Sequence, residues 1–77
     1  MRVTITRCPA TIIAESFGPG AVLIEQLAVA MGAAARVTRQ VEGRIYATPT
    51  AGTVAELAER ARVWLEARGH EVAVGDW

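Results

Sequence analysis

A Gly-Pro-Gly turn directly precedes an apolar helical pattern in the stretch SFGPGAVLIEQLAVAMGA, residues 16–33. Glycines tolerate positive φ and allow another backbone to come close. The first turn of a helix has unpaired N–H groups and a partial positive charge, which together suit a phosphate. Glycine turns also precede many helices that bind no ligand, so both interpretations stay open. The candidate phosphate loop consists of Gly18, Pro19, Gly20 and Ala21.

The remaining residues offer little for catalysis. His70 is the only histidine and follows the helix-ending Gly69, which is typical of a solvated loop position. Cys8 is typical of a small, partly apolar residue at a strand end, and nothing in the spacing favours a Cys8–His70 dyad. No spacing matches a zinc or calcium site. We therefore expect no enzymatic activity, no metal and no cofactor.

The composition predicts one small domain over residues 1–77. Its residues are 52% hydrophobic but only 5% aromatic, so the core must consist mainly of Val, Ile, Leu and Ala. A domain of this size has only a few kcal/mol of stability to spare. Self-association or docking to a protein partner is therefore a natural expectation.

The net charge, the cysteine count and the lack of targeting segments limit the classes of partner that we expect. The formal net charge is zero, which argues against broad binding to duplex nucleic acid but not against a short single strand in one groove. The single cysteine excludes an intramolecular disulfide. With no secretory signal or membrane segment, we expect a cytoplasmic protein with no membrane partner. All cations are arginines, which is typical of GC-rich bacterial or phage genomes.

The hydrophobic pattern predicts an α+β domain. Residues 2–7 alternate as a strand, and residues 35–48 form a hairpin that turns at Glu42-Gly43. Helices are predicted from Ala21 to Gly32 and over residues 53–69, followed by a short last strand over residues 71–77. Residues 10–17 fit either a short helix or a strand.

The two predicted helices differ in character. The second begins with a capping box of Thr53 and Glu56, and i,i+4 pairs support its solvated side. Its buried stripe is Val54, Leu57, Ala58, Ala61, Trp64 and Leu65. The first is apolar on more than one side, which indicates either a central core helix or a helix shared with a partner.

The run IAESFGPGAVLIEQLAVAMGA, followed by a hairpin and an amphipathic helix, resembles the type I K-homology (KH) domain. The loop reads Phe17-Gly18-Pro19-Gly20-Ala21, with apolar residues at Ile24 and Leu27 and a glycine at Gly32. The resemblance spans roughly residues 3–68. It implies a three-stranded antiparallel sheet with helices packed on one face, to which residues 71–77 would add a C-terminal strand.

The resemblance also implies a function. In KH domains the loop contacts the backbone of about four unpaired nucleotides, beside an apolar groove that receives the bases. Carried over, the loop is Gly18 to Ala21, and the hairpin residues Arg36, Arg39 and Arg44 would bind phosphates. The candidates for the apolar floor are Ile13, Phe17, Ile24 and Val37, although each also suits core packing.

This chain departs from the KH pattern at three points. Ala21 replaces a loop glycine, the loop contains no Lys or Arg, and the net charge is zero. These departures suit a KH-like fold that has lost nucleic-acid binding and holds a protein partner.

A second interpretation makes residues 11–16 a strand and gives a ferredoxin-like βαββαβ order. This resembles an ACT domain, which binds amino acids at dimer interfaces, but it places Glu25 in a core position. Strand order distinguishes the two folds. A central strand 2–7 favours KH, whereas central strands 11–16 and 71–76 favour the ferredoxin-like fold.

The leading expectation is thus a small module that binds single-stranded RNA or DNA. The alternatives are a protein-interaction or assembly domain, with self-association as one form, and a small-ligand regulatory domain. Fold alone does not decide among them.

Overall fold

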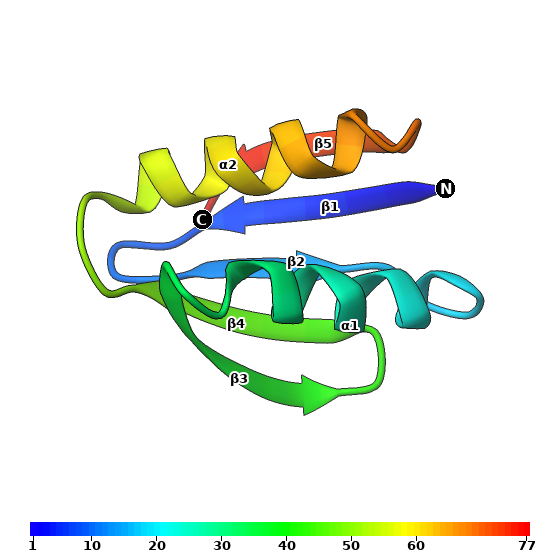
Figure 1. The fold of residues 1–77 in the computed structure, drawn as a ribbon, viewed down its shortest axis with the longest axis horizontal. Coiled ribbons are helices and arrows are strands. Elements are labelled where there is room, and N and C mark those ends of the chain that lie inside the picture. The colour runs from blue at the N-terminus through cyan, green and yellow to red at the C-terminus, as the bar shows by residue number, and fades with distance from the viewer.

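The computed structural model describes residues 1–77 as one α+β domain, a mixed sheet with two helices packed on one face (Figure 1). The sheet has five strands in the order β3-β4-β2-β1-β5. In chain order the elements are β1 (Arg2–Arg7), β2 (Ile12–Glu15), α1 (Gly20–Met31), β3 (Ala35–Val41), β4 (Arg44–Pro49), α2 (Val54–Glu66) and β5 (Glu71–Asp76).

The predicted three-stranded antiparallel sheet is not confirmed, because two further strands join it. Within the ambiguous segment 10–17, residues 12–15 form β2, which pairs antiparallel with both β1 and β4. Its β-branched Ile12 and Ile13 favour a strand, and two neighbouring strands satisfy its backbone on both sides. The last predicted strand is present as β5, which pairs parallel to β1 and makes the sheet mixed.

The strand order matches neither expectation completely. From β2 to β5 the elements follow the predicted βαββαβ order, and β2 is the central strand. However, residues 71–76 lie at an edge of the sheet rather than in the middle, and β1 is inserted between them and β2. The short connection Cys8–Thr11 accounts for this insertion, because it folds β1 back directly beside β2, where the Cys8 N–H donates to the Thr11 carbonyl over 2.8 Å.

The core lies between the helices and one face of the sheet. Alternate residues of the strands point into it, including Val3 and Ile5 of β1 and Ile45 and Ala47 of β4. The helices contribute Leu23, Ile24, Leu27, Ala28, Met31, Leu57, Ala58, Ala61 and Leu65. The predicted stripe of α2 is confirmed, with Val54 and Trp64 half-buried at its margins. Neither helix combines the length and the apolar character that crossing a membrane requires.

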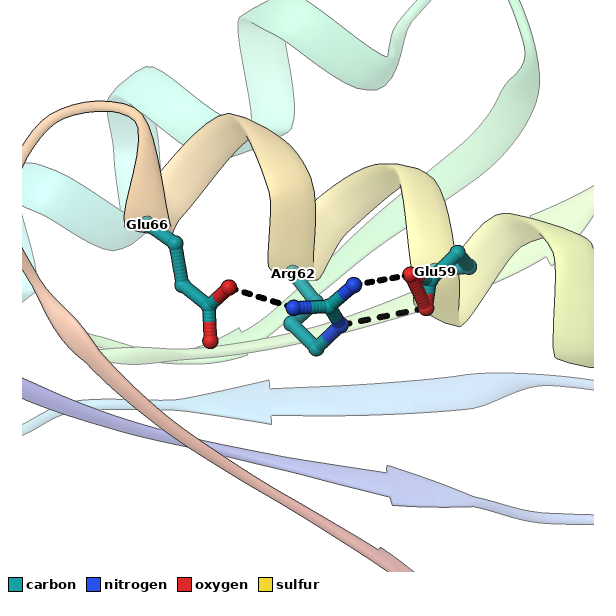
Figure 2. A network of polar contacts seen from close by, with 3 residues as sticks. All are labelled: Glu59, Arg62 and Glu66. Atoms are coloured by element: carbon teal, nitrogen blue, oxygen red, sulfur yellow. Dashed lines mark hydrogen bonds and ion pairs between the residues drawn. The ribbon is translucent and has the colours of Figure 1, made fainter.

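Helix α2 is stabilised by its own side chains. The predicted capping box is present, since the Glu56 N–H donates to Thr53 Oγ1 and the Thr53 N–H donates to the Glu56 carboxylate. One helical turn later, Arg62 lies between Glu59 and Glu66 and is ion-paired with both (Figure 2). These exposed pairs support the helix at its solvated side.

We expect the Thr53→Ala variant to lower the free energy of unfolding by about 1 kcal/mol, because it removes one half of the capping box. Urea denaturation measures this change. The matched control is Thr38→Ala, an exposed threonine of β3 without a side-chain hydrogen bond, which should change the stability by less than about 0.5 kcal/mol. Equal effects of the two variants would contradict the capping role.

Candidate functional site

The glycine turn joins the end of β2 to the start of α1. Gly18 has a φ of +64°, and a Cβ atom built there meets no other atom within 4 Å. Its left-handed backbone therefore explains a glycine at this position. Pro19 then takes a helical conformation and forms the N-terminal boundary of α1 without a side-chain cap.

Gly20 is required for a different reason. A Cβ atom at this position would lie 1.9 Å from the Ser16 Oγ atom, so the start of α1 packs directly on that side chain. The Ser16 hydroxyl donates to the Arg2 carbonyl over 2.9 Å, and the Ser16 N–H donates to the Gly43 carbonyl over 2.8 Å. The turn is thus fastened to the start of β1 and to the tip of the β3–β4 hairpin.

Most backbone donors of the predicted phosphate loop are already engaged. The Gly20 N–H donates to the Phe17 carbonyl over 3.2 Å, and the Ala21 N–H donates to the Gly18 carbonyl over 3.1 Å. Pro19 has no N–H. Of the four predicted loop residues, only Gly18 has an N–H without a hydrogen-bond acceptor. Phosphate binding at this turn stays a prediction. Only one N–H group of the predicted loop, that of Gly18, is free to donate to an anion.

The three predicted arginines do not converge. Arg39 lies on the helix-covered side of β3 and binds Glu25 of α1 through a salt bridge of 2.6 Å. Arg44 forms a 2.9 Å salt bridge with Glu15, its cross-strand neighbour on the uncovered face of the sheet. Arg36 shares that uncovered face but pairs with Thr48, toward the other end of the hairpin.

The four residues predicted to form the apolar floor also lie in different environments. Ile24 is part of the core, and Val37 packs against it. Ile13 alternates with the buried Ile12 and Ala14 and so faces the uncovered side of the sheet. Phe17 is 56% exposed at the turn, with the Arg44 guanidinium 5.7 Å from the centre of its ring.

A groove of about 480 Å³ lies between α1 and the β3–β4 hairpin, directly beside the turn. Two exposed valines line it, Val22 at 66% and Val41 at 54%. A Cβ atom added at Gly43, which also lines the groove, would lie 3.0 Å from the Phe17 ring, so Phe17 lies at the same end of the molecule. There it lines a separate hollow with Arg2, Thr4, Glu15 and Ser16. We call Phe17, Val22 and Val41 the apolar rim.

The sequence prediction missed Val22 and Val41 as site residues. Val22 stands seven residues before Val29, which is 73% exposed on the same side of α1, so helix periodicity alone points both residues away from the core stripe. No comparable signal exists for Val41, because a register shift in β3 between Arg39 and Val41 interrupts the strand's regular alternation there.

The groove contains polar groups but no reactive cluster. The Glu25–Arg39 pair lines it, and no three His, Cys, Asp or Glu side chains gather as metal ligands would. Cys8 and His70 lie at opposite ends of β1, since Cys8 follows the strand and His70 contacts the Met1 amine. The arrangement is suited to binding apolar groups.

The ion pair between Glu25 and Arg39 shifts the pKa of each group away from its ordinary value. A hydrogen bond from Arg39, reinforced by its charge, lowers the pKa of Glu25 below its ordinary value despite some desolvation. Because the pKa is lower in the folded state, the pair stabilises the fold above the usual carboxylate pKa. That contribution is lost as the pH falls through the lowered value.

We expect Gly20→Ala to reduce the free energy of unfolding by roughly 1–3 kcal/mol, because the new methyl group overlaps Ser16. Gly18→Asn is the matched control, since asparagine tolerates left-handed backbone and the site is open, and it should cost less than about 1 kcal/mol. Urea denaturation compares the two variants. A larger loss for Gly18→Asn would refute this assignment of the two glycines.

We expect Arg39→Gln to raise the pKa of Glu25 toward the ordinary carboxylate value, because the charged hydrogen-bond donor is lost. NMR pH titration of the Glu25 side chain measures this shift. Arg36→Gln, on the opposite face of β3, should leave the titration unchanged. A Glu25 pKa that is the same in all three proteins would show that the pair does not form in solution.

Comparison of the chain with protein families and with curated proteins gives no match. The KH and ferredoxin-like resemblances therefore stay predictions. What the chain binds has to be inferred from the turn, the apolar rim and the groove between them.

Proposed function

We propose that this chain is a protein-interaction domain that docks a segment of another protein in the groove between α1 and the β3–β4 hairpin. The observation that carries the proposal is the apolar rim. Val22 of α1 and Val41 of β3 line the groove and are each more than half exposed, and Phe17 is 56% exposed at the turn beside it. Exposed apolar groups gathered around a concavity are typical of binding surfaces.

The outer side of α1 extends this surface. Val29 lies two helical turns beyond Val22 and is the more exposed of the two. The helix has no acidic residue in its first turn and no basic residue in its last, so a partner lying along it meets little charge. The partner we infer is a segment with apolar anchor side chains, for which burial of the rim provides the binding free energy.

The Glu25–Arg39 pair provides the polar part of the groove. Both groups are exposed and satisfy one another, so a partner can cover them without leaving an unpaired charge. The ion pair would therefore orient a polar group of the partner rather than attract a strongly charged one. This agrees with the zero net charge of the chain.

Binding of single-stranded nucleic acid is the second candidate, and it would use the same surface. In its favour, Gly18 is open and Phe17 offers an exposed ring on which a base could stack. Against it, Arg39 and Arg44 are already paired with carboxylates, and the turn has one loop N–H without an acceptor. Phosphate contacts supply most of the affinity for such a ligand, so we rank this candidate below protein docking.

A displayed peptide library tests the proposal, with selection on the unmodified chain and depletion of peptides that also bind Val22→Glu. We expect enriched peptides to contain apolar anchors. In fluorescence-polarisation titrations, their affinity should fall at least roughly tenfold for Val22→Glu and for Val41→Glu, about the cost of losing one buried aliphatic contact. Val63→Glu is the matched control, because Val63 is an exposed valine of α2 away from the groove, and it should bind within about twofold of the unmodified chain.

Two results would contradict protein docking. One is a selection that yields no peptide whose affinity depends on Val22 and Val41. The other is saturable binding of a labelled single-stranded oligonucleotide at low salt that Phe17→Ala abolishes, which would favour the nucleic-acid candidate.

A further inference from the structure

The two edges of the sheet differ in how well they are protected against pairing with another strand. Edge strand β3 has a register shift between Arg39 and Val41 and carries two arginines, features that discourage strand addition. Edge strand β5 has neither feature. It pairs with β1 at every position from Glu71 to Asp76, and its central residues, 72–75, are small or apolar.

The backbone of β5 shows which groups face outward. The Glu71 N–H donates to the Met1 carbonyl over 2.9 Å, and the Trp77 N–H donates to the Arg7 carbonyl over 2.8 Å. Because direction alternates along a strand, the odd-numbered residues face β1. The N–H and C=O groups of Val72, Val74 and Asp76 therefore point away from the sheet, where an added strand would receive them.

We propose that the outer edge of β5 pairs antiparallel with the same edge of a second copy of this chain. A two-fold axis brings identical edges together and joins the two sheets, with all helices on one face. This pairing involves β5 alone and does not depend on the groove between α1 and the hairpin.

The outward groups restrict the register. In an antiparallel pair, hydrogen-bonded positions must both have outward N–H and C=O groups, so Val72 can lie opposite Val74 of the second copy. In this register Ala73 lies opposite Ala73 of the second copy, on the two-fold axis. A shift by one residue would place outward groups opposite inward ones and form no ladder.

Side chains and charges are complementary in this register. The two valines share the helix-covered face, and pairing covers Val74, which is 38% exposed. Glu71 lies opposite Gly75, and His70 lies opposite Asp76, so no like charges face one another across the seam. In the register shifted by two residues, Val72 would face the Asp76 carboxylate instead. The 87%-exposed Trp77 extends past the strand toward the open turn at Gly69 of the second copy.

The contact between the two β5 strands is short, and its length determines how strongly we expect the chain to dimerise. A pair of six-residue strands covers less surface than a standard protein interface. We therefore expect a reversible dimer, seen as a weight-average mass that rises with concentration toward twice the monomer mass. Sedimentation equilibrium of the unmodified chain measures it.

Disulfide cross-linking tests the register, in a Cys8→Ser background that removes the native thiol. Ala73 would be a non-hydrogen-bonded pair on the axis, with Cα atoms about 4.5 Å apart, within the range a disulfide spans. Ala73→Cys should cross-link at least roughly tenfold faster than Val63→Cys, an exposed position on α2 that reports random collisions. Faster cross-linking of Val72→Cys or Val74→Cys than of Ala73→Cys would overturn the register.

A charge variant completes the test. Ala73→Arg places like charges opposite one another on the axis and should abolish the concentration dependence of mass, while urea denaturation shows a folded monomer. Val22→Glu should leave dimerisation unchanged, so failure of the groove proposal and failure of this one are distinguishable. An unmodified chain that stays monomeric at every concentration, with Ala73→Cys no faster than Val63→Cys, would overturn the proposal.

Discussion

The hydrogen bonds and contacts of Ser16 hold together the end of the fold that carries the candidate site. Its N–H donates to the Gly43 carbonyl of the hairpin, its hydroxyl donates to the carbonyl of Arg2, the first residue of β1, and its side chain fills the space that a residue larger than glycine would take at position 20. Three elements are therefore fixed relative to one another around one buried residue. The turn closes on its own carbonyls, so its N–H groups are largely used, while Phe17 is turned outward over Gly43.

The insertion of β1 between β2 and β5 separates the two surfaces that we assign. The hairpin lies at one edge of the sheet and β5 at the other, with β2 and β1 between them (Figure 1). The groove and its apolar rim belong to the hairpin edge, and the outward backbone groups of β5 belong to the opposite one. One copy can therefore dock a partner segment at the groove while its β5 pairs with a second copy. A small domain whose core has little stability to spare gains from both contacts.

Local sequence signals predicted most elements and only part of the site. The Thr53–Glu56 capping box and the α2 stripe are contained within one helix, so their spacing suffices to recognise them. Residues 10–17 stayed ambiguous because Ile12, Ile13 and Phe17 suit both a helical turn and a strand, and only pairing with β1 and β4 decides. The candidate arginines could be recognised in the sequence, but their carboxylate partners could not. Glu25 and Arg39, for example, form their ion pair only after α1 packs across the hairpin. Likewise, the excess of apolar residues in α1 indicated a second covered side without showing that Val41 would line the same groove as Val22.

The turn is closed by its own hydrogen bonds, which in the function that we propose leaves apolar contact as the main means of binding at the groove. Amide hydrogen exchange of the unmodified chain, followed residue by residue by NMR, measures whether these N–H groups are hydrogen-bonded. We expect slowed exchange at Gly20 and Ala21, whose N–H groups donate to carbonyls of the turn, and fast exchange at Gly18. Fast exchange at all three would contradict this expectation, because the amides would then be free to bind an anion.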